Sequence, residues 1–439
     1  MKRDRRSRAE AGCDMDCDWQ KATAGFFEAS LIGRNRKSIG PAALSPPRSE
    51  EPPSTFPKSS IASAATGNLS WLPESESRPG GTSGVALRLA PGLSFAAAPG
   101  GAISGTSFMA DNLQVLLDHR PSGNVSPTNF RIVQAPVPAP GPGQALVRHM
   151  FLSLDPYMRG RLSDAKSYAK PQEVGEVMQG GTVGLVEASN NPRFKPGDAV
   201  VGMGGWQRYA LSDGGDLRVI DAKAIPIQAY LGPVGMPGVT AWYGLNKIIA
   251  PKAGETVLVS AATGAVGSVV GQLAGAAGAH TVGIAGGPEK CAYAVQELGY
   301  DACVNHKSPN FAEELKAAVP NGVDGLFENV GGEPFRQAFR RLNDFSRVAV
   351  CGLIASYEGA PTAIPDMRIV LTRRIKIEGF IVSDHMKLRP EAIAELAGRV
   401  AAGRLKSRET IRDGLENAPQ ALVDLLRGEN FGKMLVRVD

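Results

Sequence analysis

The stretch from Val257 to Gly271, which reads VLVSAATGAVGSVVG, constrains the fold of this chain more than any other segment. Val257–Val259 is a short apolar run that is typical of a buried strand in a parallel sheet. Ala262, Gly264 and Gly267 follow at the spacing of G-x-G-x-x-G, with alanine in the first place. Residues without bulky side chains let backbone N–H groups approach a pyrophosphate at the start of a helix. The stretch therefore predicts a dinucleotide-binding turn, and the alternative is a tight turn that is merely packed with small residues.

Strand and helix patterns alternate along the chain after this turn, which predicts an α/β fold with a doubly wound parallel sheet. We expect strands within 280–286, 301–307, 322–332, 345–358 and 373–384, and helices within 268–279, 288–299, 309–320 and 334–342.

Between residue 109 and the turn, the chain has a different residue pattern. Apolar runs alternate there with Pro and Gly turns, as in short antiparallel strands, so we expect a partly open β-barrel. Two strands are expected within 176–187 and two more within 194–211, and a helix should begin at Met236. The C-terminal stretch 418–439 predicts one helix and a strand that returns to the barrel. We therefore predict domains at 109–231 and 232–402, followed by a C-terminal return at 403–439.

Residues 1–108 differ from the rest of the chain in composition and in hydrophobic pattern. Pro, Ser, Gly and Ala dominate this segment without a period of 2 or 3.6, so it cannot bury enough apolar surface to offset its backbone entropy. We expect a disordered N-terminal extension. A sharper hypothesis is that the extension is misassigned and that Met109 is the true initiator.

Charge and cysteine usage exclude several classes of protein. A net charge of +5 is small for 439 residues and forms no basic stripe, so we expect no nucleic-acid partner. No run of about twenty apolar residues occurs, so we expect no membrane span. One C-x-x-x-C pair lacks a second pair to complete a zinc site. We expect free thiols and a cytoplasmic location. The cysteines are Cys13, Cys17, Cys291, Cys303 and Cys351.

The end of the second expected strand indicates which dinucleotide is bound. NAD-binding sheets carry Asp or Glu there, whereas this strand ends in Ala285 and two glycines. Lys290 is the nearest cation, which favours the 2′-phosphate of NADPH. His306 and Lys307, at the end of the third strand, could complete the phosphate site. The plainer alternatives are a solvated helix face for Lys290 and a surface histidine for His306.

Three glycine-containing segments follow later strands, at 329–332, 351–357 and 379–384. Ligands of a doubly wound sheet bind beyond the carboxyl ends of its strands, so these segments could approach a nicotinamide ring. Tyr357 is the titratable side chain of its loop that is suited to donate a proton to an enolate. The alternative is a packing residue with its hydroxyl on a neighbouring carbonyl.

From residue 109 to 439 the chain resembles the zinc-independent medium-chain dehydrogenase/reductases, in the branch of prostaglandin, plant double-bond and bacterial curcumin reductases. The resemblance rests on the motifs LDPYMRGR, GEVMQGGTVG, MPGVTAWYGL, SAATGAVGSVVGQLAG, ENVGG, CGLIASY, IEGFIVSDH and NFGKMLVRV. The Gly-His-Glu motif and the cysteine cluster of the zinc-dependent branch are missing from the sequence. The resemblance implies a GroES-like catalytic domain, a Rossmann domain, an active site between them and a homodimer.

The resemblance also implies roles for particular residues. The expected cofactor-binding residues are Gly264, Ala265, Val266, Gly267, Lys290, Asn329, Cys351, Gly352, Leu353, Phe380, Ile381, Val382 and Asn430. Many relatives have a tyrosine where this chain has His306, although an imidazole can also donate to a phosphate oxygen. No metal ligand is expected.

These observations predict NADPH-dependent reduction of the carbon–carbon double bond of an α,β-unsaturated ketone or aldehyde. Hydride adds to the β-carbon, and Tyr357 is the expected donor to the enolate that forms. Tyr157 and Tyr168 are expected to contact the substrate, or else only to close the cleft. Two alternatives remain at this point, a quinone oxidoreductase of the same superfamily and a sensor that binds NADPH with little turnover.

Overall fold

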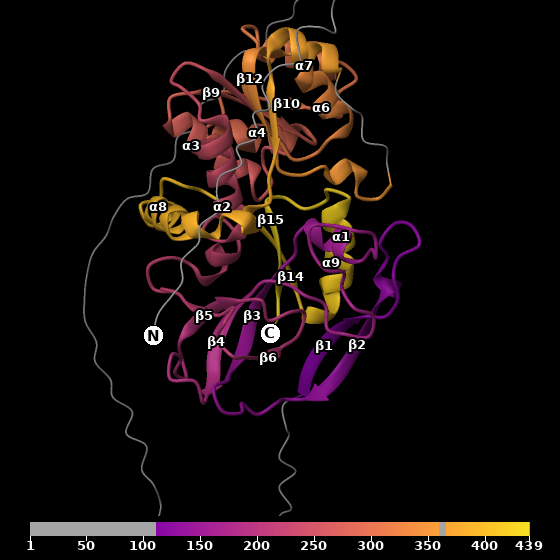
Figure 1. The fold of residues 1–439 in the computed structure, drawn as a ribbon, viewed down its shortest axis with the longest axis vertical. Coiled ribbons are helices and arrows are strands. Elements are labelled where there is room, and N and C mark those ends of the chain that lie inside the picture. The colour runs from indigo at the N-terminus through magenta and orange to yellow at the C-terminus, as the bar shows by residue number, and fades with distance from the viewer. Residues whose placement is uncertain (1–110, 360–365, 439) are drawn as a thin grey trace, which may run out of the picture. The chain divides into compact units, whose positions relative to one another are not determined.

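The computed structural model describes residues 111–359 and 366–438. The predicted disorder of 1–108 and the predicted start at Met109 lie outside these residues. Within them the chain forms a two-stranded, a six-stranded and a seven-stranded sheet (Figure 1). The two-stranded sheet pairs β1 (Asp111–Leu117) with β2 (Phe130–Pro136). None of the helices in the described ranges is long and apolar enough to cross a bilayer.

The six-stranded sheet is parallel and doubly wound, as predicted. Its strand order is β10-β9-β8-β11-β12-β13, so the chain runs outward from β8 in one direction and then in the other. The order therefore reverses between β8 and β11, which is where such sheets bind ligands. Its strands are β8 (Thr256–Ser260), β9 (His280–Ala285), β10 (Ala302–Asn305), β11 (Val323–Glu328), β12 (Leu342–Val350) and β13 (Lys376–Gly379).

Helices cover this sheet on both faces because its strands are apolar on both sides. Val257 and Val259 of β8 lie in one buried cluster, and Leu258 between them lies in another. All three side chains are fully buried, as expected for a central parallel strand. The helices of this part of the chain are α2 (Met236–Tyr243), α3 (Gly267–Ala276), α4 (Pro288–Gln296), α5 (Phe311–Ala318), α6 (Gly332–Phe339), α7 (Met367–Arg373) and α8 (Arg389–Ala401).

The seven-stranded sheet combines the N-terminal β-rich segment with the end of the chain. Its order is β14-β15-β3-β4-β5-β7, and β6 pairs with β3. In Figure 1 the yellow C-terminal strands lie among the purple and magenta ones, because β15 pairs antiparallel with β3. The elements are β3 (Ala145–Ser153), α1 (Tyr157–Arg161), β4 (Thr182–Ser189), β5 (Ala199–Gly202), β6 (Tyr209–Ser212), β7 (Arg218–Val219), β14 (Glu409–Asp413), α9 (Ala418–Leu426) and β15 (Lys433–Arg437).

One of the expected strands differs from the structure. Residues 176–187 contribute one strand, β4, instead of two, and Val177 makes only an isolated bridge to Leu116. A Cβ at Gly180 would lie 2.9 Å from the Leu152 side chain, so this segment bends closely around its neighbours. The single strand expected within 373–384 is β13, which begins after Arg374 ends α7 in a left-handed conformation. The predicted domain boundaries stay predictions.

Candidate active site

The glycine turn joins β8 to α3 at the point where the strand order reverses. Ala261 has a left-handed φ of 50°, and the Gly264 N–H donates to the Ala261 carbonyl over 2.9 Å. Gly264, Ala265 and Val266 are partly exposed, whereas Gly267 is buried. A Cβ at Gly267 would lie 2.3 Å from the Ala261 carbonyl oxygen. Gly267 therefore serves the packing of the turn against the helix, and the three residues before it leave their backbone partly exposed.

Three basic side chains gather beside the turn between β9 and α4. A Cβ at Gly286 would lie 3.0 Å from His306 Nε2 and 3.5 Å from Lys307 Cε. Burial lowers the pKa of His306, and the charges of Lys307 and Lys290 lower it further. Burial and the charge of Lys307 likewise lower the pKa of Lys290. These groups repel one another, and an anionic phosphate placed among them would relieve the repulsion.

Lys290 also connects α4 to the loop that precedes β15. Its ammonium donates to the carbonyls of Gly428 and Asn430, over 2.9 and 2.7 Å. The Asn430 side chain donates to the Gly432 carbonyl over 2.6 Å, so its amide nitrogen is used within the loop. The structure thus brings together two predicted cofactor residues that lie 140 positions apart.

The ends of β8 and β11 are fastened to each other by Asn329. Its side-chain amide donates to the Ser260 carbonyl over 2.7 Å, and its backbone N–H donates to Ser260 Oγ over 2.8 Å. The neighbouring Glu328 is completely buried, and its Oε1 accepts from the N–H groups of Val330 and Gly331, each over 2.6 Å. Its Oε2 has no hydrogen-bond partner among the described residues. Burial raises the pKa of Glu328 to about 7.

The loop after β12 is held against the same strand end. The N–H groups of Cys351 and Gly352 both donate to the Glu328 carbonyl, over 2.9 and 3.2 Å. Burial and the nearby Glu328 carboxyl raise the pKa of Cys351 to about 12, so the thiol stays protonated at neutral pH. Glu328 therefore holds two predicted cofactor loops, one through its side chain and one through its carbonyl.

Tyr357 folds back over its own loop. Its hydroxyl lies 3.4 Å from the position that a Cβ would occupy at Gly352. Burial raises the pKa of Tyr357, and a hydrogen bond from the Leu353 backbone acts in the opposite direction. The Tyr357 hydroxyl is thus neutral and lies above the loop that is expected to line the nicotinamide. Its neighbour Glu358 accepts from the Val125 N–H over 3.0 Å, which fastens this loop to the β-rich part.

Tyr157 and Tyr168 reach the same region from the β-rich part. Tyr157 begins α1, and burial is the largest cause that raises its pKa. Tyr168 is 59% exposed, and partial burial raises its pKa as well. Tyr168 interacts electrostatically with both Tyr157 and Tyr357. Tyr168 and Tyr357 also interact with Cys351, whereas Tyr157 interacts with Tyr168 alone of these groups.

Phe380 is placed differently from the other predicted cofactor residues. Its ring is 8% exposed and packs against Tyr243 and Phe327, with ring centroids 5.4 and 6.3 Å apart. Its side chain belongs to the core, so a contact with a cofactor would be made by its backbone. Ile381 and Val382 are partly exposed.

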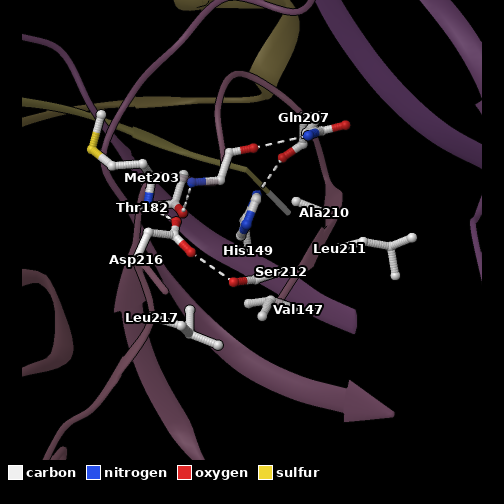
Figure 2. Close-up of a pocket in the computed structure, with 11 residues that line it drawn as sticks. Val147, His149, Thr182, Met203, Gln207, Ala210, Leu211, Ser212, Asp216 and Leu217 are labelled. Carbon is white, nitrogen blue, oxygen red and sulfur yellow. Dashed lines mark hydrogen bonds between the residues drawn. The ribbon is translucent and has the colours of Figure 1, made fainter. Parts of the chain in front are cut away.

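A separate pocket of about 130 Å³ lies in the β-rich part and contains none of the predicted site residues (Figure 2). There His149 Nδ1 lies 2.7 Å from the Gln207 carbonyl oxygen, and Ser212 donates to Asp216 over 2.6 Å. No group of three His, Cys, Asp or Glu residues that could hold a metal ion occurs in the ranges 111–359 and 366–438.

Sequence reasoning missed three residues of this region, although each lies inside a motif that it had singled out. They are Glu328 in ENVGG, Arg161 in LDPYMRGR and Lys433 in NFGKMLVRV. The motifs drew attention to the right segments, but the contacts of these side chains depend on residues elsewhere in the chain.

Two segments of the chain match known protein families, and several known proteins are similar to most of it. Residues 113–220 match the family described as the N-terminal domain of oxidoreductase, and residues 265–398 match the family described as zinc-binding dehydrogenase. The chain is 46% identical over 334 residues to the NADPH-dependent curcumin reductase of Escherichia coli K12, covering 74% of this chain and 97% of that protein. It is 37% identical to the NADP⁺-dependent 2-alkenal reductase of Nicotiana tabacum, covering 74% and 97%.

Solved structures show the same relationship. The crystal structure of CurA from Vibrio vulnificus in complex with NADPH is 45% identical, with a TM-score of 0.71, and covers 74% of this chain and 99% of that one. A quinone oxidoreductase from Pseudomonas syringae is 20% identical with a TM-score of 0.61 over 74% of this chain and 99% of that one, a likeness that shows the fold alone.

Proposed function

Because the chain belongs to the medium-chain dehydrogenase/reductases, in the branch of curcumin, prostaglandin and 2-alkenal reductases, we propose that it reduces the carbon–carbon double bond of α,β-unsaturated ketones or aldehydes with NADPH. The observation that carries the proposal is that Tyr168 and Tyr357 both lie near Cys351, with Tyr157 near Tyr168. Neutral phenols donate hydrogen bonds, and an enone carbonyl needs such donors when negative charge grows on its oxygen.

The residues beside the glycine turn fit NADPH. Gly264–Val266 offer partly exposed backbone to a pyrophosphate. Lys290 and Lys307 offer positive charge to a 2′-phosphate, and the neutral His306 ring offers an N–H donor. No carboxylate stands at the end of β9 to repel that phosphate. When bound, NADPH supplies the hydride that adds to the carbon β to the carbonyl.

Tyr357 is the proposed proton donor to the enolate. Its raised pKa keeps the hydroxyl protonated at neutral pH, so it can donate a hydrogen bond to the carbonyl oxygen. Once hydride has added to the β-carbon, the hydroxyl can transfer its proton to the enolate. Tyr157 and Tyr168 are proposed to hold the substrate from the opposite side. Cys351 does not compete for the electrophilic β-carbon, because a thiol with a pKa of about 12 is almost entirely protonated.

The proposal is tested by NADPH oxidation, followed by absorbance, with an enone and a quinone under matched conditions. We expect turnover of the enone. Faster turnover of the quinone would favour a quinone oxidoreductase, and saturable binding of NADPH without oxidation would favour a sensor.

The role of Tyr357 is tested by Tyr357→Phe. The variant should lose roughly a hundredfold in kcat, the usual scale for one donor to a developing oxyanion, with the KM for NADPH nearly unchanged. Tyr209→Phe, which removes a hydroxyl on β6, is the matched control and should retain its activity. An unaltered kcat in Tyr357→Phe would remove this residue from the mechanism.

We further propose that the protein is a cytoplasmic homodimer. Cys291, Cys303 and Cys351 are free thiols, which suits a reducing compartment. β13 ends its sheet and has no strand beside its outer edge in the described part of the chain, so a second copy could continue the sheet there. Apolar side chains are exposed near that edge, with Leu371 at 78% and Phe345 at 63%.

Light scattering after gel filtration tests the dimer. The wild-type protein should have the mass of two chains, and Leu371→Glu should shift it toward one. Ile132→Glu, which changes an exposed apolar residue on β2, is the control. A wild-type mass of one chain would overturn this part of the proposal.

A further inference from the structure

Two free cysteines meet where α4 packs against β10. Cys303 lies on β10 beside Gly283 of β9, and a Cβ at Gly283 would lie 3.2 Å from the Cys303 Sγ. Cys303 packs against the same buried cluster as Ala294 of α4, which lies one turn after Cys291. The Cys303 thiol donates a hydrogen bond to the Cys291 sulfur. The two sulfur atoms therefore face each other between the helix and the sheet.

This hydrogen bond gives the two thiols different reactivity. It is the largest cause that lowers the pKa of Cys291, and a hydrogen bond from the Ala285 backbone lowers that pKa as well, against the effect of burial. The pKa of Cys303 is raised, because its thiol is the donor and because it is buried. The thiolate is the form that attacks an oxidant, and Cys291 is partly exposed to solvent. Cys291 is thus the sulfur that reacts first, with Cys303 in contact to react with the product.

The thiol pair lies next to the residues that are expected to bind the 2′-phosphate. Cys291 follows Lys290 in the first turn of α4. The turn before this helix is fastened to the end of β10, because the Gly287 N–H donates to Asn305 Oδ1 over 2.8 Å. A displacement of Cys291 toward β10 therefore also displaces Lys290.

We propose that Cys291 and Cys303 are a peroxide-sensitive thiol pair, and that its closure to a disulfide weakens the binding of the 2′-phosphate of NADPH at Lys290. An S–S bond of about 2 Å is much shorter than a hydrogen bond between two sulfur atoms, so its formation draws the first turn of α4 toward β10. A reversible disulfide of this kind suits a reducing compartment. The effect on the cofactor rests on the proposed role of Lys290, whereas the reaction of the thiols does not.

The reaction consumes one hydrogen peroxide for each disulfide. The Cys291 thiolate attacks one peroxide oxygen, the O–O bond breaks, and the hydroxide that leaves takes up a proton to become water. The Cys303 sulfur then attacks the Cys291 sulfenic acid, an S–S bond forms and the S–O bond breaks. The second hydroxide leaves with the proton of the Cys303 thiol as water. Two thiols are oxidised by two electrons in total, and the peroxide is reduced to two molecules of water.

Peptide mapping tests the reaction of the thiols. Both cysteines lie in one tryptic peptide, 291–307, because no Lys or Arg occurs between Lys290 and Lys307. After one equivalent of hydrogen peroxide, unfolding and alkylation, we expect this peptide without alkyl groups and two hydrogen atoms lighter than the reduced peptide. Cys351, whose pKa of about 12 keeps its thiol protonated, is the internal control and should be alkylated. Alkylation of both cysteines in 291–307, or oxidation of Cys291 without an S–S bond, would overturn the proposal.

Calorimetric titration with NADP⁺ tests the effect on the cofactor. In the peroxide-treated protein we expect the Kd for NADP⁺ to rise roughly tenfold, the scale of one hydrogen bond to a charged group, and the Kd for NAD⁺ to change less than about twofold. Dithiothreitol should restore the Kd for NADP⁺. A disulfide that leaves this Kd unchanged would overturn the inference.

Two serine variants separate the disulfide from other oxidation. Cys291→Ser lacks the reactive thiol, so its Kd for NADP⁺ should be the same before and after peroxide treatment. Cys303→Ser keeps that thiol but forms no disulfide, so its Kd should also stay unchanged. The wild-type rise in Cys303→Ser would assign the effect to Cys291 alone and contradict the inference. If the reduced protein oxidises NADPH with no enone, the proposed function has failed, and the peptide map still decides whether the disulfide forms.

Discussion

Glu328 accepts hydrogen bonds from both of the loops that are predicted to bind the cofactor. Its side chain accepts from the N–H groups of Val330 and Gly331, and its carbonyl accepts from Cys351 and Gly352. A side chain that is completely buried and has one oxygen without a partner favours the protonated carboxyl. The protonation of Glu328 should therefore be linked to the stability of the folded chain.

This linkage gives a pH dependence of defined sign. The pKa of Glu328 rises from 4.5 to about 7 on folding, so its contribution to stability is complete below 4.5 and is lost as the pH rises through 7. The loss amounts to roughly 3 kcal/mol. Cys351, the titratable neighbour, stays protonated over this range and adds no slope.

Glu328→Gln is the test at this position. Glutamine keeps an acceptor for Val330 and Gly331 and does not ionise, so the variant should lose less stability than the wild-type protein between pH 5 and pH 8. Thermal unfolding of both proteins across this range measures the difference. Parallel curves for the two proteins would contradict a raised pKa at Glu328.

Among the elements, β15 is fastened to the turn that precedes α1. Lys433 begins this strand and is 3% exposed, and its ammonium donates to the Leu154 carbonyl over 2.5 Å and to Asp155 over 2.9 Å. Ser153 also donates to Asp155. The buried ion pair therefore fixes the turn between β3 and α1, two residues before Tyr157.

Removing the cation of this buried ion pair should lower the unfolding free energy considerably. Lys433→Met leaves the Asp155 carboxylate buried without its cation, so we expect a loss of about 3 to 5 kcal/mol in unfolding free energy. Lys406→Met is the control, because Lys406 and Glu297 form an exposed pair and the loss there should stay below about 1 kcal/mol. Denaturant unfolding measures both, and similar losses in the two variants would contradict the prediction.

The elements that were predicted from the sequence are those with a local signature. The β8 turn and α3 could be placed because an apolar run and small residues follow each other within 15 positions. α8 and β14 were missed: α8 contains Ala392 and Leu396 among charged residues, and β14 is only partly buried. The ion pair of Lys433 with Asp155 spans 278 positions, and no local pattern reports such a contact.

For the molecule as a whole, the cofactor should bind to α4 and the C-terminal loop together. Lys290 connects them through Gly428 and Asn430, and the same residue is expected to bind the 2′-phosphate. NADP⁺ at about a hundred times its Kd should raise the unfolding free energy by roughly 2.7 kcal/mol. Lys290→Ala should lose most of this gain for NADP⁺ but keep the smaller gain for NAD⁺.

Thermal shift with each nucleotide measures these gains. Lys316→Ala, which removes an exposed lysine on α5, should behave as the wild-type protein does. An equal loss for both nucleotides in Lys290→Ala would assign this lysine to the loop rather than to the phosphate.

The two carbonyls that Lys290 already holds have a consequence for the discrimination between nucleotides. An arriving phosphate must compete for an ammonium group whose protons are largely engaged, so the preference for the phosphorylated form is the difference between two sets of contacts. On the proposed role of Lys290, we expect residues 428–430 to influence cofactor choice without touching the distinguishing group. Shortening this loop should change the preference even when every basic side chain is kept.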